Sequence, residues 1–295
     1  MSSTLMADLF AVIAPVFFVA AAGFAWGRAG RPFDTNQLTP LITHVGTPCL
    51  VLAAFLKVEL DLAALGQVAL ASAVAHALFC AGGWLALHLA GLPKRPYLGG
   101  LMFPNSGNMG LPLCLFAFGQ EGLALAIGFF AVSAVSQFTI GQAIAAGHAS
   151  PKRLLSTPIV WALALALILV ATDTELPRWA FNTVDLAGQF TIPLMLLALG
   201  VSLSRLGVSS LGRSGALAVL RIAGGIAVGF LLAWLFGLEG MARGVVIIQS
   251  AMPVAVFNYL FAQLHNNRPE EVAGMVVLST ALSFATLPLL LGVIL

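Results

Sequence analysis

Ten apolar stretches follow one another along this sequence, each about as long as a helix that crosses a lipid bilayer. Such a helix needs about 20 consecutive, mostly apolar residues, because the hydrocarbon core is about 30 Å thick. The connections between the stretches are short, so we expect no water-soluble domain. The predicted spans run over residues 9–27, 38–56, 66–91, 97–118, 122–147, 155–172, 182–204, 214–237, 241–263 and 271–294.

The composition agrees with a chain embedded in lipid. Of the 295 residues, 60% are hydrophobic and only 8% are charged, whereas a soluble domain carries about 25% charged residues. The expected fold class is therefore an all-α, polytopic membrane protein with the lipid bilayer as its surroundings. A formal net charge of +2 does not indicate a nucleic-acid partner. Three cysteines in apolar stretches do not indicate a disulfide framework.

Basic residues divide unevenly between the two sides of the predicted helix bundle. Nine lie in the loops after the odd-numbered spans and three in the loops on the other side. Because cytoplasmic loops are enriched in Lys and Arg, the first set predicts the cytoplasmic side. Both termini are then expected outside, in a multi-pass protein of the cell inner (cytoplasmic) membrane. The nine are Arg28, Arg31, Lys94, Arg95, Lys152, Arg153, Arg205, Arg213 and Arg268, and the three are Lys57, Arg178 and Arg243.

The fourth span contains residues that disfavour a helix. Glycine costs about 1 kcal/mol and proline about 3 kcal/mol in a helix interior, and in lipid the freed backbone groups need partners inside the protein. We therefore predict that this stretch is broken and lines a cavity, as half of a substrate site. Its candidate substrate-binding residues are Asn105, Ser106, Gly107, Asn108, Gly110 and Pro112, and Pro104 precedes them.

The ninth span carries a similar interruption, with candidate substrate-binding residues Gln249, Ser250, Pro253 and Asn258. An ordinary proline kink with amides that join helices is the alternative reading. Proline suits the first turn of a helix, so we expect half-helices to begin near Pro112 and Pro253. Their unpaired N–H groups and positive dipole ends would attract a carboxylate. The carbonyl groups left by the preceding half-helices would hold a cation or water.

Weak internal similarity predicts two repeats, residues 1–150 and 151–295. Pro48 and Pro193 are 193 − 48 = 145 positions apart, and so are His76 and Arg221. An offset of 144 places Asn105–Ser106 over Gln249–Ser250. Since each repeat has an odd number of spans, five, the second is expected to be inverted, as in many secondary transporters.

The positions of the ionisable residues limit which transport mechanisms are expected. All acidic residues lie at or near span ends, which argues against an antiporter that trades protons on buried aspartates. Among the basic groups inside the spans, His76 and Arg221 are candidate supporting residues. A histidine there is either packed and neutral or functional. Arg221 either extends toward the inner face, or attracts an anion or makes a structural pair.

The segment Asn-Ser-Gly-Asn-Met-Gly-Leu-Pro at residues 105–112 resembles the fourth-span signature of the auxin efflux carrier family. That family includes plant PIN carriers and bacterial malate or malonate permeases. The resemblance extends along the chain through its length, the Pro48 and Pro193 helices and the proline-containing spans 4 and 9. It implies a fold similar to bile-acid sodium symporters and sodium/proton antiporters, with broken helices 4 and 9 crossing at the substrate.

The resemblance also implies two structural units. A scaffold would be formed by residues 9–56 and 155–204, approximately, and a transport domain that moves like an elevator would be formed by residues 66–147 and 214–294, approximately. Asn105 or Asn108, together with Asn258, would match positions that contact substrate. The connection at residues 148–157 is short, so regulation through a long cytosolic loop is not implied.

The leading hypothesis is a secondary-active or facilitative carrier of a small organic anion, auxin-like or malate- or malonate-like. No cofactor or metal is expected, and a coupling ion would be a proton or sodium. A sodium-coupled carrier similar to bile-acid symporters, a channel or a receptor are alternatives. An enzyme is not expected, because the sequence contains no G-x-S-x-G, H-E-x-x-H or buried aspartate pair. A homodimer remains open.

Overall fold

A computed structural model describes residues 3–57, 61–147, 158–207 and 210–295 of the chain. Regular structure in these ranges is helical, apart from one isolated β-bridge. Seven of the described helices are long and apolar enough to cross a membrane, as expected for a polytopic membrane protein. The predicted repeat boundary at residue 150 and the basic residues Lys152 and Arg153 lie outside the described ranges.

The first part of the chain begins with two apolar helical runs and a long third helix. Asp61 caps that helix, because its carboxylate accepts the backbone N–H groups of Ala63 and Ala64 at 2.9 and 3.1 Å. The elements are α1 (Ser3–Arg28), α2 (Thr35–Leu41), η1 (Ile42–Gly46), α3 (Thr47–Leu56), α4 (Leu62–Leu89), α5 (Lys94–Met102), η2 (Ser106–Gly110), α6 (Leu111–Ser136), η3 (Gln137–Gly141) and α7 (Gln142–Ala146), where η marks a short π-helical turn.

Gly119 divides the long helical run that contains α6. The run from Ser106 to Ala146 has 41 residues, which at about 1.5 Å per residue is roughly twice the thickness of the hydrocarbon core. Gly119 has φ 68° and ψ −157°, a conformation open to glycine because it lacks a Cβ atom. The break lies between the predicted spans 97–118 and 122–147.

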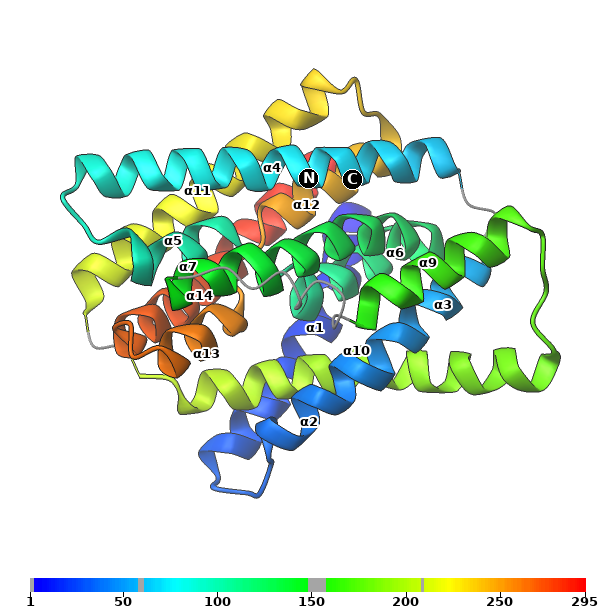
Figure 1. Cartoon of the computed structure of the whole chain (residues 1–295), viewed down its shortest axis with the longest axis horizontal. Helices are drawn as coiled ribbons and strands as arrows, with labels where there is room; N and C mark the ends of the chain where they lie inside the picture. The colour runs from blue at the N-terminus through cyan, green and yellow to red at the C-terminus, as the bar shows by residue number, and fades with distance from the viewer. Residues whose placement is uncertain (1–2, 58–60, 148–157, 208–209) are drawn as a thin grey trace.

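In the second part of the chain, as in the first, a long helix precedes a short helix that ends at a break. Its elements are α9 (Pro158–Ala171), α10 (Arg178–Arg205), α11 (Leu211–Leu235), α12 (Gly240–Ser250), α13 (Val256–Leu264) and α14 (Pro269–Ile294). In Figure 1 α4 runs through the upper part of the molecule and α10 through the lower part, with the interrupted helices between them.

Two groups of helices pack closely. In one group α1 and α3 lie against α10, and α9 lies against α3. Gly200 brings α10 so near to α1 that a Cβ atom there would overlap the carbonyl oxygen of Ala20. Lys57 at the end of α3 forms an ion pair with Asp185 of α10 at 2.5 Å. In the other group α4 packs on α6, and α11 packs on α12 and α14.

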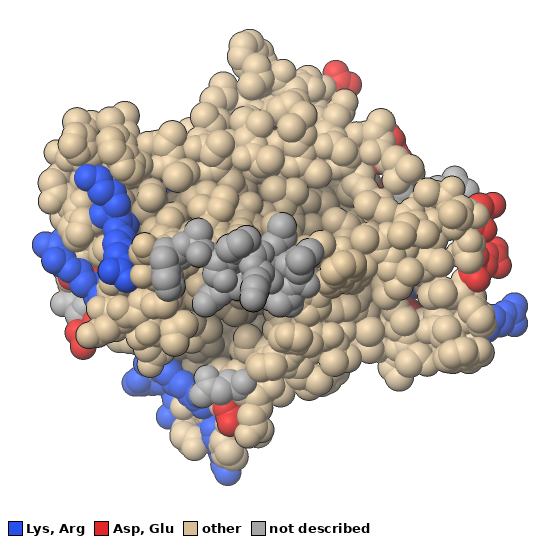
Figure 2. All heavy atoms as spheres, in the orientation of Figure 1, with Lys and Arg blue, Asp and Glu red and all other residues tan. Residues whose placement is uncertain are grey.

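Charged side chains lie mainly at the two ends of the molecule. Figure 2 shows Lys and Arg gathered near α5 and at the tip formed by α1 and α2, and the described residues between the two ends of this face are mostly uncharged. Asp and Glu gather near the α9–α10 connection at the other end. This distribution fits a protein whose middle faces lipid and whose ends face water.

Candidate functional site

The two predicted interruptions meet in the interior of the protein. After α5 and α12 end, residues 103–105 and 251–255 pass each other without helical structure. The backbone N–H of Asn105 donates to the carbonyl oxygen of Pro253 at 2.7 Å, and that of Ala255 donates to Phe103 at 3.1 Å. An antiparallel bridge joins Pro104 and Val254 between them. Each broken helix therefore satisfies backbone groups freed by the other, as lipid surroundings require.

The predicted beginnings of the new half-helices lie close to those of α6 and α13, but a further helical turn precedes the first. The helix α6 begins at Leu111, with Pro112 in its first turn, but the π-helical turn η2 already begins at Ser106. The helix α13 begins at Val256, three residues after Pro253. Proline also restricts the residue before it to an extended conformation, which ends the preceding helix. Phe103, before Pro104, has φ −106° and ψ 108°. Pro112 instead lies in the first turn of α6, inside a continuous helical run.

Arg221 of α11 binds the ends of both preceding half-helices. Its guanidinium donates to the carbonyl oxygens of Leu101 at 2.9 Å, Met252 at 3.2 Å and Ser250. The side chain is only 2% exposed, so the reading in which it extends toward the inner face is wrong and the pairing reading is confirmed. The positive charge offsets the negative dipole ends of α5 and α12. A guanidinium therefore takes the place among these carbonyls where a cation or water was expected.

His76 of α4 is buried beside the crossing and uses both ring nitrogens. Nδ1 lies 2.7 Å from the carbonyl oxygen of Ser72, and Nε2 lies 3.0 Å from the hydroxyl of Ser133 in α6. The Ser106 hydroxyl in turn donates to Ser133 at 3.2 Å. The packed, hydrogen-bonded environment predicted as one reading of His76 is thus present, and it connects to a candidate site residue.

A cavity of about 290 Å³ extends from the crossing to the end of α10 that carries Arg205. This volume is close to the lower limit of about 300 Å³ for small-molecule sites. Of the predicted residues, Asn105, Ser106, Gly107 and Asn108 line it. Its other lining residues are Thr35, Thr39, Ile42, Thr43, Thr47, Pro104, Phe130, Gln137, Phe138, Met195, Ala198, Ser202, Arg205, Leu206, Ala255, Val256, Phe257, Tyr259, Leu260 and Gln263.

Four threonines in this lining were missed by the sequence analysis. Thr35, Thr39, Thr43 and Thr47 are each four positions apart, the spacing that brings side chains to one face of a helix. The hydroxyl of Thr43 donates to the carbonyl oxygen of Thr39, so part of this face satisfies itself. The regular spacing is the signal that could have identified the residues.

Two residues of the cavity wall carry unpartnered side-chain amides. Asn105 Nδ2 and Gln137 Nε2 are buried and have no hydrogen-bond partner within the described residues. Both residues belong to the lining. Because buried polar groups are normally hydrogen-bonded, these two donors are candidates for hydrogen bonds to a bound solute.

The remaining predicted site residues lie outside this lining. Gly110 packs against Gln249, whose Nε2 lies 3.9 Å from the sulfur of Cys114. Asn258 Nδ2 donates to the carbonyl oxygens of Ala255 at 3.0 Å and Phe103 at 3.4 Å. The residues of this group are buried in or next to the interrupted segments, and they are Gly110, Pro112, Gln249, Ser250, Pro253 and Asn258.

The crossing also revises the predicted correspondence between the two interruptions. Gln249–Ser250 end α12, whereas Asn105 lies in a break and Ser106 begins a new helical turn, so the predicted offset of 144 is wrong here. The bridge pairs Pro104 with Val254, an offset of 254 − 104 = 150. The same offset relates Asn108 to Asn258, since 258 − 108 = 150.

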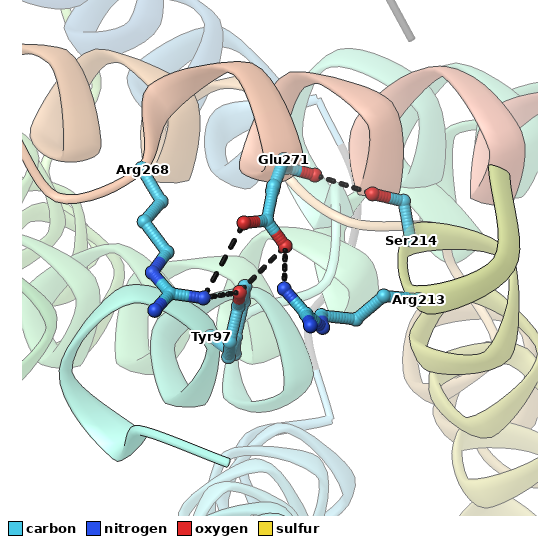
Figure 3. Close-up of polar contacts among 5 residues, drawn as sticks. All are labelled: Tyr97, Arg213, Ser214, Arg268 and Glu271. Atoms are coloured by element: carbon cyan, nitrogen blue, oxygen red, sulfur yellow. Dashed lines mark hydrogen bonds and ion pairs between the residues drawn. The ribbon is translucent and has the colours of Figure 1, made fainter. Parts of the chain in front are cut away.

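A polar cluster holds the beginning of α5 against two neighbouring helices (Figure 3). Tyr97 of α5 donates its hydroxyl to the Glu271 carboxylate of α14 at 2.6 Å, and Arg213 of α11 donates to the same oxygen at 2.8 Å. Arg268 donates to the Tyr97 hydroxyl at 3.0 Å, and Ser214 donates to the Glu271 backbone carbonyl at 2.9 Å. The cluster joins α5, α11 and α14 at one end of the bundle.

Comparison with known proteins gives an independent indication of function. Residues 142–291 match the family described as membrane transport protein. An uncharacterized transporter of Methanocaldococcus jannaschii is 28% identical over 214 residues, which cover 66% of this chain and 68% of that protein. An uncharacterized transporter of Methanothermobacter thermautotrophicus is 25% identical over 271 residues, which cover 87% and 88%. Together with the family match, these similarities show that the chain belongs to the auxin efflux carrier family of membrane transport proteins.

Proposed function

We propose that the protein is a secondary-active or facilitative carrier of a small organic anion, a carboxylate of the auxin or malate and malonate kind. The observation that carries this proposal is the cavity at the helix crossing, with the unpartnered amides of Asn105 and Gln137 in its wall. Amide and hydroxyl donors suit a carboxylate, and the helical segment that begins at Ser106 adds a positive dipole end.

The charges around the cavity favour the same ligand class. Arg205 is the one charged side chain among the described lining residues, and no Asp or Glu belongs to that set. Arg205 donates to the carbonyl oxygen of Phe33 at 2.7 Å, which holds its guanidinium at the open end of the cavity. A fixed positive charge at an entrance raises the local concentration of anions.

We further propose ten crossings arranged as two inverted five-helix repeats. The break at Gly119 supports this count, because it divides one long helical run into two crossings. The short helix before each break, α5 or α12, forms one crossing together with the helical segment that follows the break. In both parts of the chain a long helix, α4 or α11, comes before the interrupted one. An inverted arrangement of this type is common among secondary transporters.

An elevator-type movement is the proposed mechanism. The cavity wall combines α2–α3 and α10 of the proposed scaffold, residues 9–56 and 155–204, with the crossing of the proposed transport domain, residues 66–147 and 214–294. Movement between these bodies would carry the crossing from one side of the membrane to the other. The cavity leads to the basic ends of the helices, so the positive-inside rule makes this a cytoplasm-facing form, with both termini outside the inner membrane.

Binding and flux are measured on the purified protein with malonate, malate and indole-3-acetate, and with an organic cation of similar size as the control. A bound anion should raise the apparent melting temperature by mass action, and radiolabelled anion should accumulate in proteoliposomes. Neither stabilisation nor uptake by any of the three anions would refute the proposed substrate class. Stabilisation without uptake would instead favour a receptor.

A further inference from the structure

We propose that His76 takes up one proton with each transported anion, through the hydroxyl groups of Ser133 and Ser106. The protein would then be a proton-coupled anion symporter. This inference rests on the proposed function, because it assigns the coupling ion to the same site. It goes further by naming the group that holds the proton and the route by which the proton reaches it.

The hydrogen bonds of His76 determine the donor-to-acceptor direction of the hydrogen-bond chain from Ser106 through Ser133 to the imidazole. The carbonyl oxygen of Ser72 can only accept, so Nδ1, 2.7 Å away, must carry a hydrogen. In a neutral imidazole Nε2 is then an acceptor, and it accepts the hydroxyl hydrogen of Ser133 at 3.0 Å. The Ser133 oxygen accepts from Ser106 at 3.2 Å. Two consecutive hydroxyl groups therefore donate from the cavity wall toward the imidazole.

This arrangement can pass a proton inward without moving a heavy atom far. A hydronium ion in the cavity gives a proton to the Ser106 oxygen, Ser106 gives its own hydrogen to Ser133, and Ser133 gives its own to Nε2. The products are an imidazolium at His76, two neutral serines and one water molecule, so atoms and charge balance. Reversal of the same steps returns the proton to the cavity. Ser106 is the member of the chain that lines the cavity.

The surroundings of His76 make protonation depend on a bound anion. From its own helix the ring meets Ser72 and Phe79, from α6 it meets Phe129 and Ser133, and from the crossing it meets Phe103. Arg221 of α11 is the charged group that acts on it among the described residues. The Arg221 guanidinium lies 4.2 Å from the centre of the Phe79 ring, whose centre is 6.1 Å from that of His76.

Two positive charges in this apolar interior repel each other. A carboxylate at Asn105 and Ser106 would offset that repulsion, so anion binding and protonation should favour one another. By thermodynamic reciprocity, each ligand raises the affinity of the other by the same factor. Sodium is a poorer candidate for this role, since the Arg221 guanidinium already binds the carbonyl ends of α5 and α12.

The test measures proton and anion movement together in proteoliposomes that contain a trapped pH indicator. Wild-type protein and the variants His76→Gln, Ser133→Ala and His88→Gln are compared with malonate, malate and indole-3-acetate. His88 lies on the same helix but is exposed, so His88→Gln is the matched control. Binding of each anion is measured separately by thermal shift at pH 6 and pH 8.

We expect wild type and His88→Gln to acidify the vesicle interior during anion uptake and to bind the anion at least several-fold more tightly at pH 6. His76→Gln should still bind, but its affinity should be independent of pH and its anion uptake should move no protons. Ser133→Ala keeps the imidazole and should slow proton movement by about tenfold, which provides a second reading if His76→Gln folds poorly.

Two results would overturn the inference while leaving the carrier proposal intact: wild-type uptake without proton movement, or proton-coupled uptake by both His76→Gln and Ser133→Ala. A purely structural histidine predicts the second result, or a loss of stability without any change in coupling. If wild-type protein neither binds nor transports any of the three anions, the proposed function fails first and the inference fails with it.

Discussion

The backbone N–H of Asn105 lies 2.7 Å from the carbonyl oxygen of Pro253, and this bond joins two interrupted helices from opposite halves of the chain. The reciprocal bond from Ala255 to Phe103 is 3.1 Å long. Together they allow irregular backbone to exist in the interior of a membrane protein, where unpaired peptide groups cost several kcal/mol each. The cavity and its candidate ligands are positioned by this crossing.

The first prediction separates an amide that faces the cavity from one that supports the crossing. Asn105→Ala should weaken binding of the transported anion by about tenfold or more, because one hydrogen bond to a charged group contributes about 1.5–3 kcal/mol. Asn258→Ala should instead lower the melting temperature, since its amide binds the carbonyl oxygens of Ala255 and Phe103. Thermal unfolding with and without anion measures both effects. Unchanged affinity in Asn105→Ala would remove this residue from the site.

The second prediction concerns the buried guanidinium. Arg221→Ala should destabilise the protein by on the order of 3 kcal/mol or more, because the carbonyl oxygens of Leu101, Ser250 and Met252 lose their donor. Carbonyl oxygens are ligands for hard cations, so sodium should partly restore the melting temperature of this variant but not raise that of wild type. Arg178→Ala, which removes an exposed arginine, is the control. An equally stable Arg221→Ala would contradict the assigned role.

The third prediction uses two adjacent glycines of α11. A Cβ atom at Gly225 would overlap the backbone carbonyl of Ser250, whereas at Gly224 it would meet nothing within 4 Å. Gly225→Ala should therefore destabilise by about 1–3 kcal/mol through overpacking. Gly224→Ala should be neutral or stabilising, because alanine is favoured over glycine in a helix by about 1 kcal/mol. Melting temperatures in one detergent check the pair, and equal values would disprove the close contact.

The fourth prediction tests the polar cluster at the beginning of α5. Tyr97→Phe keeps the buried ring but removes the hydroxyl that donates to Glu271 and accepts from Arg268. We expect a loss of about 1 kcal/mol of stability, seen as a lower melting temperature, with anion affinity unchanged because Tyr97 is not in the cavity wall. Tyr259→Phe, at the cavity, should instead weaken anion binding and leave the melting temperature unchanged. A weaker anion affinity in Tyr97→Phe would connect the cluster to the site.

The interruptions in the two helices could be predicted from the sequence because their signal is strong. Prolines, glycines and amides within an apolar stretch conflict with a continuous helix in lipid, and both breaks were confirmed. Their detailed position was harder to predict. A proline favours the first turn of a following helix, but it also keeps the preceding residue extended. At Pro104 and Pro253 the chain stays non-helical past the proline, and helical structure resumes at Ser106 and Val256.

Other features depend on distant contacts that sequence patterns do not contain. The position of Arg221 in α11 is compatible with either a path to the surface or a buried pair, and only packing brings it to Leu101 and Ser250. The threonine face of α2–α3 does carry a four-residue spacing, but threonine is common enough in membrane helices to pass unnoticed. Apolar sequences can also be aligned at many offsets, which explains the incorrect 144.

The exchange of hydrogen bonds between residues 103–105 and residues 253–255 has a consequence for the synthesis of the protein in the cell. During synthesis the first interruption enters the membrane well before its counterpart has been made. Until then its peptide groups need a temporary partner, such as water or the insertion machinery. A message truncated before Gly240 would yield a polypeptide that never acquires the missing partner, and we would expect quality-control proteases to remove it rather than half a transporter to accumulate.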